Sequence, residues 1–165
     1  MRRRCSRARR PGLSSLARGC GDTRPDPRPG ARRSCLAWFN GGNLQYDPFF
    51  GEPRNAVFDP LTGLFSDVEN MARGRWYPTV TTLGDGRVMT FSGLLEVGGT
   101  NTTVEMYTVG SGWSQPYPAG WTPPLYPRMH LSTDGRVFYA GSTRSSRFFN
   151  PSNGTWSAIV ATTNH

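Results

Sequence analysis

From about residue 36 onward, short β-branched and aromatic runs alternate with polar turns that contain glycine. The β-branched run at residues 77–83 predicts a strand, and residues 87–91 predict the strand that returns beside it. Residues 102–107 alternate polar and apolar side chains and predict a third strand, after which Trp113 opens a short fourth. Because no segment has a convincing helical period, the pattern predicts an all-β chain.

Asp85-Gly86 lies between the first two of these strands. An Asp-Gly pair at such a place is a signal for a two-residue hairpin. It predicts a type I′ turn, in which both central residues have positive φ.

The same plan recurs further along the chain. Tyr77-Pro78 and Tyr126-Pro127 are 49 residues apart, and so are the two Asp-Gly-Arg-Val runs that begin at Asp85 and Asp134. A repeat of about 50 residues that consists of short strands is typical of a kelch-type β-propeller blade. The second unit is expected to have strands at residues 129–133, 136–140, 147–149 and 156–160.

Two turns also match position for position. Phe58-Asp-Pro-x-x-Gly63-x-Phe65 has the same pattern as Phe149-Asn-Pro-x-x-Gly154-x-Trp156, and it indicates half a unit before the first complete one. The sequence thus predicts a kelch-type β-propeller fragment of about two and a half four-stranded blades. Since propellers close with about four to eight blades, we expect the missing blades of the propeller to be its partners.

Charge divides the chain into two parts. Residues 1–33 hold 11 arginines and two acidic residues, whereas residues 34–165 hold eight arginines and nine acidic residues. The first part is rich in Arg, Pro and Gly and has too little apolar surface to offset the entropy of ordering. We therefore predict a disordered basic N-terminal tail at residues 1–35 and a folded body at residues 36–165.

The tail has three open interpretations: a basic arm for an acidic partner, an Arg-rich transit peptide, or a wrong reading frame or start site. Its longest arginine-free stretch, residues 11–17, is too short and polar for the apolar core of a signal peptide, and no run is long enough to cross a membrane. We expect no membrane partner and no nucleic acid, although binding of nucleic acid through the tail is a third, weaker hypothesis. The cysteines match neither a disulfide framework nor a zinc site; they are Cys5, Cys20 and Cys35.

One stretch resembles a known family. Arg75-Trp76-Tyr77-Pro78, followed by Asp85-Gly-Arg-Val, resembles the galactose oxidase and glyoxal oxidase family of copper-radical oxidases, and the resemblance covers about residues 40–165. In that family a propeller holds one copper ion through two tyrosines and two histidines, and one tyrosine, cross-linked to a cysteine, carries a radical. The resemblance implies that Tyr77 is the radical and copper-ligand position, with Arg75 and Trp76 beside it, and that the protein is extracellular.

The chain departs from the family's pattern at the cysteine and the histidines. By spacing, the place of the cross-linking cysteine before Gly41 is taken by Asp26. No Tyr-His pair occurs, and the only histidines are His130 and His165. Because His130 is equivalent by repeat to Thr81, an ordinary strand residue, we expect most copper ligands to be absent and the isolated chain to bind no copper.

Two function classes follow. The first is a fragment of a secreted copper-radical oxidase, which oxidises a small alcohol, aldehyde or sugar with O2 to give hydrogen peroxide but is inactive as this isolated chain. The second is a non-catalytic kelch propeller that binds protein or carbohydrate, since one scaffold serves many functions. Tyr77 has a twin at Tyr126, and a further Tyr-Pro pair at Tyr117 lies off the repeat. Tyr-Pro could therefore be a structural opener of a blade, which leaves both classes open.

Overall fold

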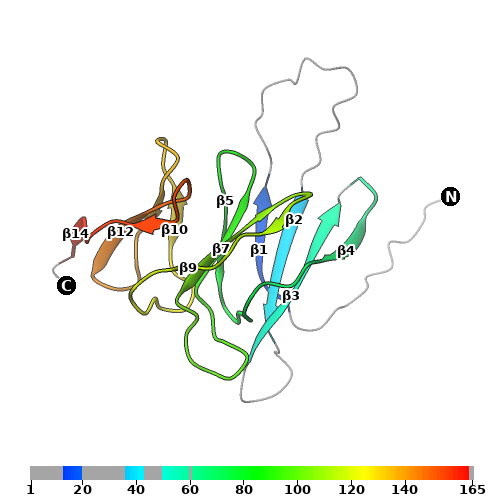
Figure 1. Ribbon diagram of the computed structural model, residues 1–165, viewed down its shortest axis with the longest axis horizontal. Helices are drawn as coiled ribbons and strands as arrows, with labels where there is room; N and C mark the ends of the chain where they lie inside the picture. The colour runs from blue at the N-terminus through cyan, green and yellow to red at the C-terminus, as the bar shows by residue number, and fades with distance from the viewer. Residues whose placement is uncertain (1–12, 20–35, 43–49, 60, 164–165) are drawn as a thin grey trace.

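The computed structural model describes residues 13–19, 36–42, 50–59 and 61–163, with side chains from residue 50 onward. The described residues form strands and no helix, and every strand pairing is antiparallel (Figure 1). The first sheet has the order β1-β2-β3-β4, and its strands are β1 Leu13–Gly19, β2 Leu36–Gly42, β3 Gly51–Asp59 and β4 Leu64–Val68.

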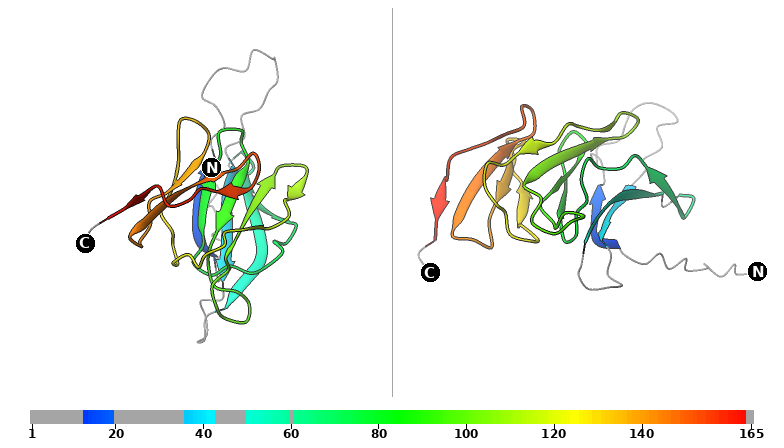
Figure 2. Two further views of the ribbon diagram at one scale, coloured as in Figure 1. Left: turned by 60° about the vertical axis from the view of Figure 1, so that its left-hand side comes forward. Right: turned by 60° about the horizontal axis from the view of Figure 1, so that its bottom comes forward.

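The next two sheets repeat this order along the chain. The second consists of β5 Thr79–Thr82, β6 Val88–Phe91, β7 Thr103–Thr108 and β8 Gly112–Trp113, with β9 Tyr117–Pro118 also pairing β7. The third consists of β10 Met129–Leu131, β11 Val137–Tyr139, β12 Ser145–Asn150 and β13 Thr155–Trp156, with β14 Ala161–Thr162 also pairing β12. Figure 2 shows the sheets one after another from the first to the third.

The all-β prediction is confirmed, and the predicted strands have counterparts in these sheets. The part of the chain that the structure describes contains three sheets and forms no closed barrel or propeller. The kelch-type propeller therefore stays a prediction.

Within the predicted tail, Leu13–Gly19 forms β1 and pairs β2, and the disordered tail otherwise stays a prediction. This strand overlaps the arginine-free stretch at residues 11–17. The rest of the predicted tail, including its three cysteines, lies outside the described residues.

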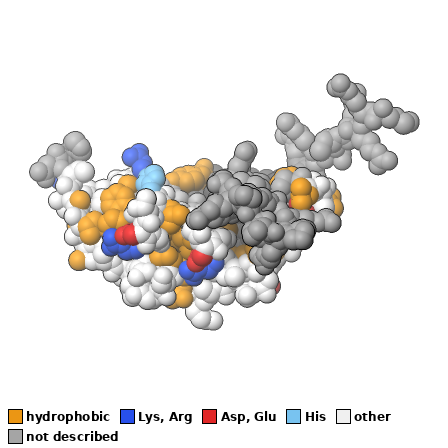
Figure 3. All heavy atoms as spheres, turned by 90° about the horizontal axis from the view of Figure 1, so that it is seen from above, with side chains coloured by type: hydrophobic (Ala, Val, Ile, Leu, Met, Phe, Trp, Pro, Cys, Tyr) orange, Lys and Arg blue, Asp and Glu red, His pale blue; other side chains and the backbone are white. Residues whose placement is uncertain are grey.

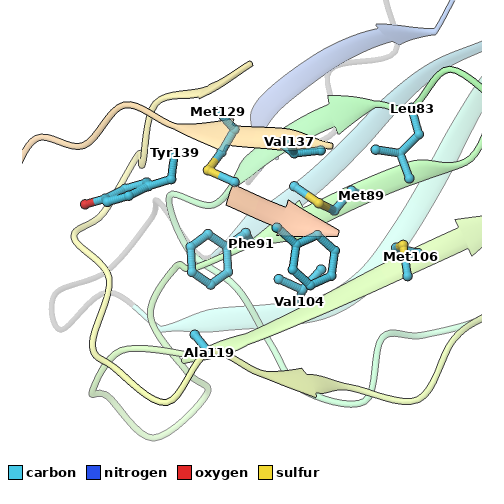
Figure 4. Close-up of a cluster of buried hydrophobic side chains, with 10 residues drawn as sticks. Leu83, Met89, Phe91, Val104, Met106, Ala119, Met129, Val137 and Tyr139 are labelled. Carbon is cyan, nitrogen blue, oxygen red and sulfur yellow. The ribbon is translucent and has the colours of Figure 1, made fainter. Parts of the chain in front are cut away.

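The middle sheet packs against a neighbouring sheet on each face. Successive side chains of its strands point to opposite sides, so one strand contributes to both contacts. Met89 and Phe91 of β6 pack with the third sheet in the larger buried cluster (Figure 4). Val88 of the same strand packs toward Val57 of the first sheet in a smaller cluster. The members of the larger cluster are Leu83, Met89, Phe91, Val104, Met106, Ala119, Met129, Val137, Tyr139 and Phe149.

The hairpin at Asp85 differs from the predicted type I′ turn. Gly86 has φ +88° and Asp85 does not have positive φ. Gly86 N–H donates to the Leu83 carbonyl at 3.1 Å, and Leu83 N–H donates to the Arg87 carbonyl at 2.8 Å. This is the three-residue loop in which a type I turn precedes a left-handed glycine, and the prediction failed because the residue before Asp85, Gly84, belongs to the loop as well.

Both copies of the Asp-Gly-Arg motif have the same local structure. The Asp85 carboxylate accepts from the backbone N–H of Arg87 at 3.1 Å and from its Nε at 2.8 Å. Asp134 and Arg136 make the same two contacts at 3.1 and 2.7 Å. The motif therefore shapes a hairpin turn and aims an arginine along the sheet.

Candidate functional site

Arg75 is the anchor of the segment that carries the candidate site. Its side chain is completely buried, and Nη2 forms an ion pair of 2.7 Å with the Glu105 carboxylate, which is also completely buried. Nη1 donates to the main-chain carbonyls of Ser92 and Thr103, both at 2.9 Å. One guanidinium thus joins the loop before β5 to the end of β6 and the start of β7.

Glu105 holds the same loop from a second direction, because its other carboxylate oxygen accepts from the backbone N–H of Ala72 at 2.7 Å. Burial lowers the pKa of Arg75, and the negative charge of Glu105 opposes that effect. The sequence pattern pointed to Arg75 but missed Glu105. A signal for it was present, since a glutamate in the middle of the alternating strand β7 is unusual unless it is paired.

Trp76 and Tyr77 follow directly from this anchor. Trp76 exchanges two backbone hydrogen bonds with Leu94, at 3.0 and 2.8 Å, so its main chain forms a short bridge. A side chain at Gly93 would come within about 3 Å of Trp76 and Arg75, so glycine is required there. The backbone of residues 75 and 76 is therefore fixed on both sides.

The chain then turns sharply at Tyr77, which has φ +60°. A left-handed conformation is rare for a bulky residue, costs about 1–3 kcal/mol, and persists only where its surroundings hold it. The predicted strand at residues 77–83 begins at Thr79 instead, because Tyr77 cannot continue a ladder in this conformation.

The turn places the Tyr77 ring flat on the Trp76 indole, with centroids 3.5 Å apart and ring planes 13° apart. The Tyr126 ring also contacts it, at 4.4 Å and 31°. Tyr77 is half-buried, and 45% of Tyr126 is exposed. We call these three residues the aromatic triad: Trp76 is buried at its base, and solvent reaches it from the side of Tyr126.

Tyr126 is the structural as well as the sequence twin of Tyr77. Its φ is +50°, and its backbone N–H donates to the Tyr77 carbonyl at 3.1 Å. Partial burial, together with the charge and hydrogen bond of the Tyr77 phenol, raises the pKa of Tyr126. The repeat therefore brings Tyr77 and Tyr126 into contact. The sequence pattern presented them as alternatives and did not predict this contact.

The described residues do not fit a copper centre by themselves. Copper sites in proteins draw on imidazole and thiolate ligands, and the described part of the chain has no group of three His, Cys, Asp or Glu residues that could hold a metal. His130 is exposed on β10, where it pairs across the strand with Phe138. His165 and the cysteines lie outside the described residues, so the triad contributes two phenols and no nitrogen or sulfur ligand.

No helix among the described residues is long and apolar enough to cross a membrane. No protein-family model matches the chain, and no curated protein matches it in sequence. Among solved structures, it is similar to a novel fungal alcohol oxidase of the AA5 family in complex with copper, with a TM-score of 0.62 and 15% identity. The match covers 91% of this chain and 31% of that one, so the chain spans about a third of the oxidase. At this identity the likeness concerns the fold.

Proposed function

We propose that this chain is part of a copper-radical oxidase similar to galactose oxidase and glyoxal oxidase, with Tyr77 as the radical-bearing phenol. The observation that carries the proposal is the flat stack of Trp76 on Tyr77, directly after the buried Arg75, whose side chain is anchored by Glu105. The fold likeness to a copper-containing fungal alcohol oxidase supports it. The complete protein would oxidise a small alcohol, aldehyde or sugar by two electrons while O2 becomes hydrogen peroxide.

In this proposal the three sheets are successive blades of a kelch-type β-propeller. Each has four main strands in the order of the chain, and the second and third share the Asp-Gly-Arg hairpin. The site needs the missing blades as partners, because the described residues supply too few copper ligands. The isolated chain is therefore inactive, and the complete protein is extracellular like the family that it resembles.

Tyr77, Trp76 and Arg75 have separate roles in this proposal. In the complete protein, copper and O2 would supply the oxidant: Tyr77 would give one electron to it and its phenolic proton to solvent, and the stacked indole of Trp76 would share the resulting electron deficiency. Arg75 acts on the backbone of this segment and not on the two rings. It is a positioning residue, which keeps the backbone on which Tyr77 turns in one place.

One-electron oxidation of the full chain tests the assignment without requiring copper. The chain is mixed with a stoichiometric outer-sphere oxidant such as hexachloroiridate, frozen at set times, and the tyrosyl radical is measured by electron paramagnetic resonance. We expect a persistent signal that Tyr77→Phe removes and that the matched variant Tyr126→Phe retains. A signal that Tyr126→Phe removes instead, or that neither variant changes, would contradict the assignment.

A second measurement addresses copper and turnover. The chain is titrated with Cu²⁺ and supplied with primary alcohols and aldehydes, and hydrogen peroxide is measured. We expect no turnover from the chain alone. Turnover that survives Tyr77→Phe would show oxidase chemistry of another origin and would refute the role of Tyr77.

The alternative is a non-catalytic kelch propeller that binds protein or carbohydrate. It is favoured by the positive φ at both Tyr77 and Tyr126, +60° and +50°, which explains both Tyr-Pro pairs as structural openers of a sheet. In that case neither tyrosine is reserved for a radical, and neither Tyr77→Phe nor Tyr126→Phe by itself removes the radical signal. Exposed aromatic rings would then serve as a stacking surface for a sugar, which titration of tryptophan fluorescence with soluble glycans would detect.

A further inference from the structure

The contact between the second and third sheets shows how two units of this chain join. A cross-strand row of the second sheet, Thr81–Met89–Met106, faces the third sheet and is almost completely buried. Arg87, at the end of this row, contacts the Met106 sulfur at 3.5 Å and donates to the Pro151 carbonyl in the turn after β12 at 3.2 Å. The joint thus has an apolar row and an arginine on one side, and a turn carbonyl on the other.

The third sheet carries the equivalent row on its outer face. The register places His130, Phe138 and Phe148 side by side across β10, β11 and β12, at the positions of Thr81, Met89 and Met106. Here the row is not buried, because His130 is exposed and both phenylalanines are half-buried.

Arg136 stands beside this outer row as Arg87 stands beside the row of the second sheet. It lies over the Phe148 ring at 4.2 Å, as Arg87 lies against Met106. Figure 3 shows hydrophobic and basic side chains together toward the end of the molecule that carries the third sheet.

The first sheet carries a turn like the one in the third sheet whose carbonyl accepts from Arg87. In the third sheet, the turn after β12 is closed by Gly154 N–H donating to Asn150 O at 2.9 Å; in the first, Gly63 N–H donates to Asp59 O at 2.8 Å. The glycines have φ +71° and +70°.

The aromatic pairs beside these turns match as well. Phe149 and Trp156, which face the second sheet, have ring centroids 5.1 Å apart, and Phe58 and Phe65 have centroids 5.0 Å apart. Phe65 is 40% exposed. The chain therefore presents the two complementary halves of its own joint at opposite ends.

We propose that two copies of this chain associate head to tail, with the outer face of the third sheet of one copy binding the first sheet of the other. The His130–Phe138–Phe148 row would cover the Phe58–Phe65 pair, and Arg136 would meet the turn that Gly63 closes. That turn carries Asp59 where the internal joint has the neutral Asn150, so opposite charges meet. Such a contact is heterologous, with different surfaces on the two copies, and it can continue from copy to copy until a ring closes.

Sedimentation velocity of the full chain at increasing concentration tests this proposal. We expect dimers and larger species, and we expect Phe148→Glu and Phe65→Glu each to weaken association by roughly tenfold or more, as loss of a central aromatic anchor does. The matched controls are Leu64→Glu, next to Phe65 but on the other side of β4, and Val97→Glu in a loop, which are 65% and 79% exposed. They should associate as the unchanged chain does.

Mixing the two interface variants gives the sharpest result. Each retains one intact surface, so at a concentration where neither variant associates alone, Phe148→Glu and Phe65→Glu should together form a 1:1 dimer that grows no further. Circular dichroism verifies that both are folded, and the milder Arg136→Ala, expected to weaken association less, replaces Phe148→Glu if that variant unfolds. A chain that stays monomeric, a symmetric dimer that both variants leave intact, or a mixture that stays monomeric would each overturn the proposal, and none depends on oxidase activity.

Discussion

Replacing Glu105 by glutamine would remove one charge from a pair that solvent does not reach. The Glu105 carboxylate lies 2.7 Å from Arg75 Nη2, and both side chains are completely buried. Glutamine has nearly the same shape and can still accept from Ala72 N–H. The variant therefore tests the charge rather than the packing.

The expected loss follows from the distance and the burial. At 2.7 Å and an effective dielectric constant of about 20, two unit charges attract by about 6 kcal/mol, before the cost of burying them is subtracted. Burial is the main cause that lowers the pKa of Arg75, so a guanidinium without Glu105 would remain in an environment that disfavours its charge. Removing one partner of a buried pair destabilises a protein by about 3–5 kcal/mol, and we expect a loss in that range from a total of about 5–15 kcal/mol.

Urea unfolding followed by tryptophan fluorescence measures the change in the free energy of unfolding. Glu96→Gln is the matched control, because Glu96 pairs with Arg73 at 3.3 Å where 51% of the arginine side chain and 32% of the glutamate side chain are exposed. An exposed pair of this kind contributes at most about 1 kcal/mol.

Arg75→Met combined with Glu105→Leu removes both charges. This double variant should recover much of the loss caused by Glu105→Gln, since the penalty comes from the unpaired charge. If Glu105→Gln costs no more than the Glu96 control, the ion pair does not anchor the loop, and the positioning role of Arg75 is wrong.

Three smaller effects concern the hairpin turn and Tyr126. Gly86 has φ +88° and space for a Cβ, so Gly86→Ala should lower the free energy of unfolding by about 1–2 kcal/mol through backbone strain. The control Gly84→Ala should be nearly neutral, and thermal denaturation measures the stability of both variants. The arginine next to the turn, Arg87, holds the pKa of Asp85 below its ordinary value. The pair therefore adds stability above the unfolded pKa of about 3.9, and this stability is lost as pH falls through the folded pKa. Asp85→Asn should remove this pH dependence, which urea unfolding below about pH 4 measures; the effect should be under about 1 kcal/mol because the carboxylate is half exposed. The Tyr126 phenol should ionise above an ordinary value of about 10 in an ultraviolet titration, and Tyr77→Phe should bring its pKa down; no change would contradict their contact.

The repeat predicted most of the fold because its landmarks have local physical causes. Each Asp-Gly-Arg run forms its own hairpin turn through contacts within three residues, so the sequence of the run is enough to predict the turn's position. The β-branched and alternating runs around it then form strands wherever the turns leave them. Local causes of this kind are visible without knowledge of distant residues.

The parts that the sequence did not reveal depend on partners far along the chain. Glu105 contacts Arg75 across 30 residues. The contact between Tyr77 and Tyr126 depends on the packing of the second and third sheets, which a pattern of periods does not describe. Likewise, β1 pairs β2, although Leu13–Gly19 has too little apolar character to predict a strand by itself.

The two tyrosines show which part of the candidate site the fold explains and which part it does not. Both turn at a positive φ before a proline, so the Tyr-Pro pair is accounted for by the way each sheet begins. By the repeat, however, the counterpart of Arg75 is Pro124, whose carbonyl accepts from Ser92 Oγ at 2.6 Å, with no buried charge. The second copy thus begins its sheet without an ion pair, although burying a charged pair is often no better for stability than an apolar replacement. An expensive pair at only one of two equivalent places is therefore better explained by what it positions, the stacked Trp76 and Tyr77, than by the needs of the fold.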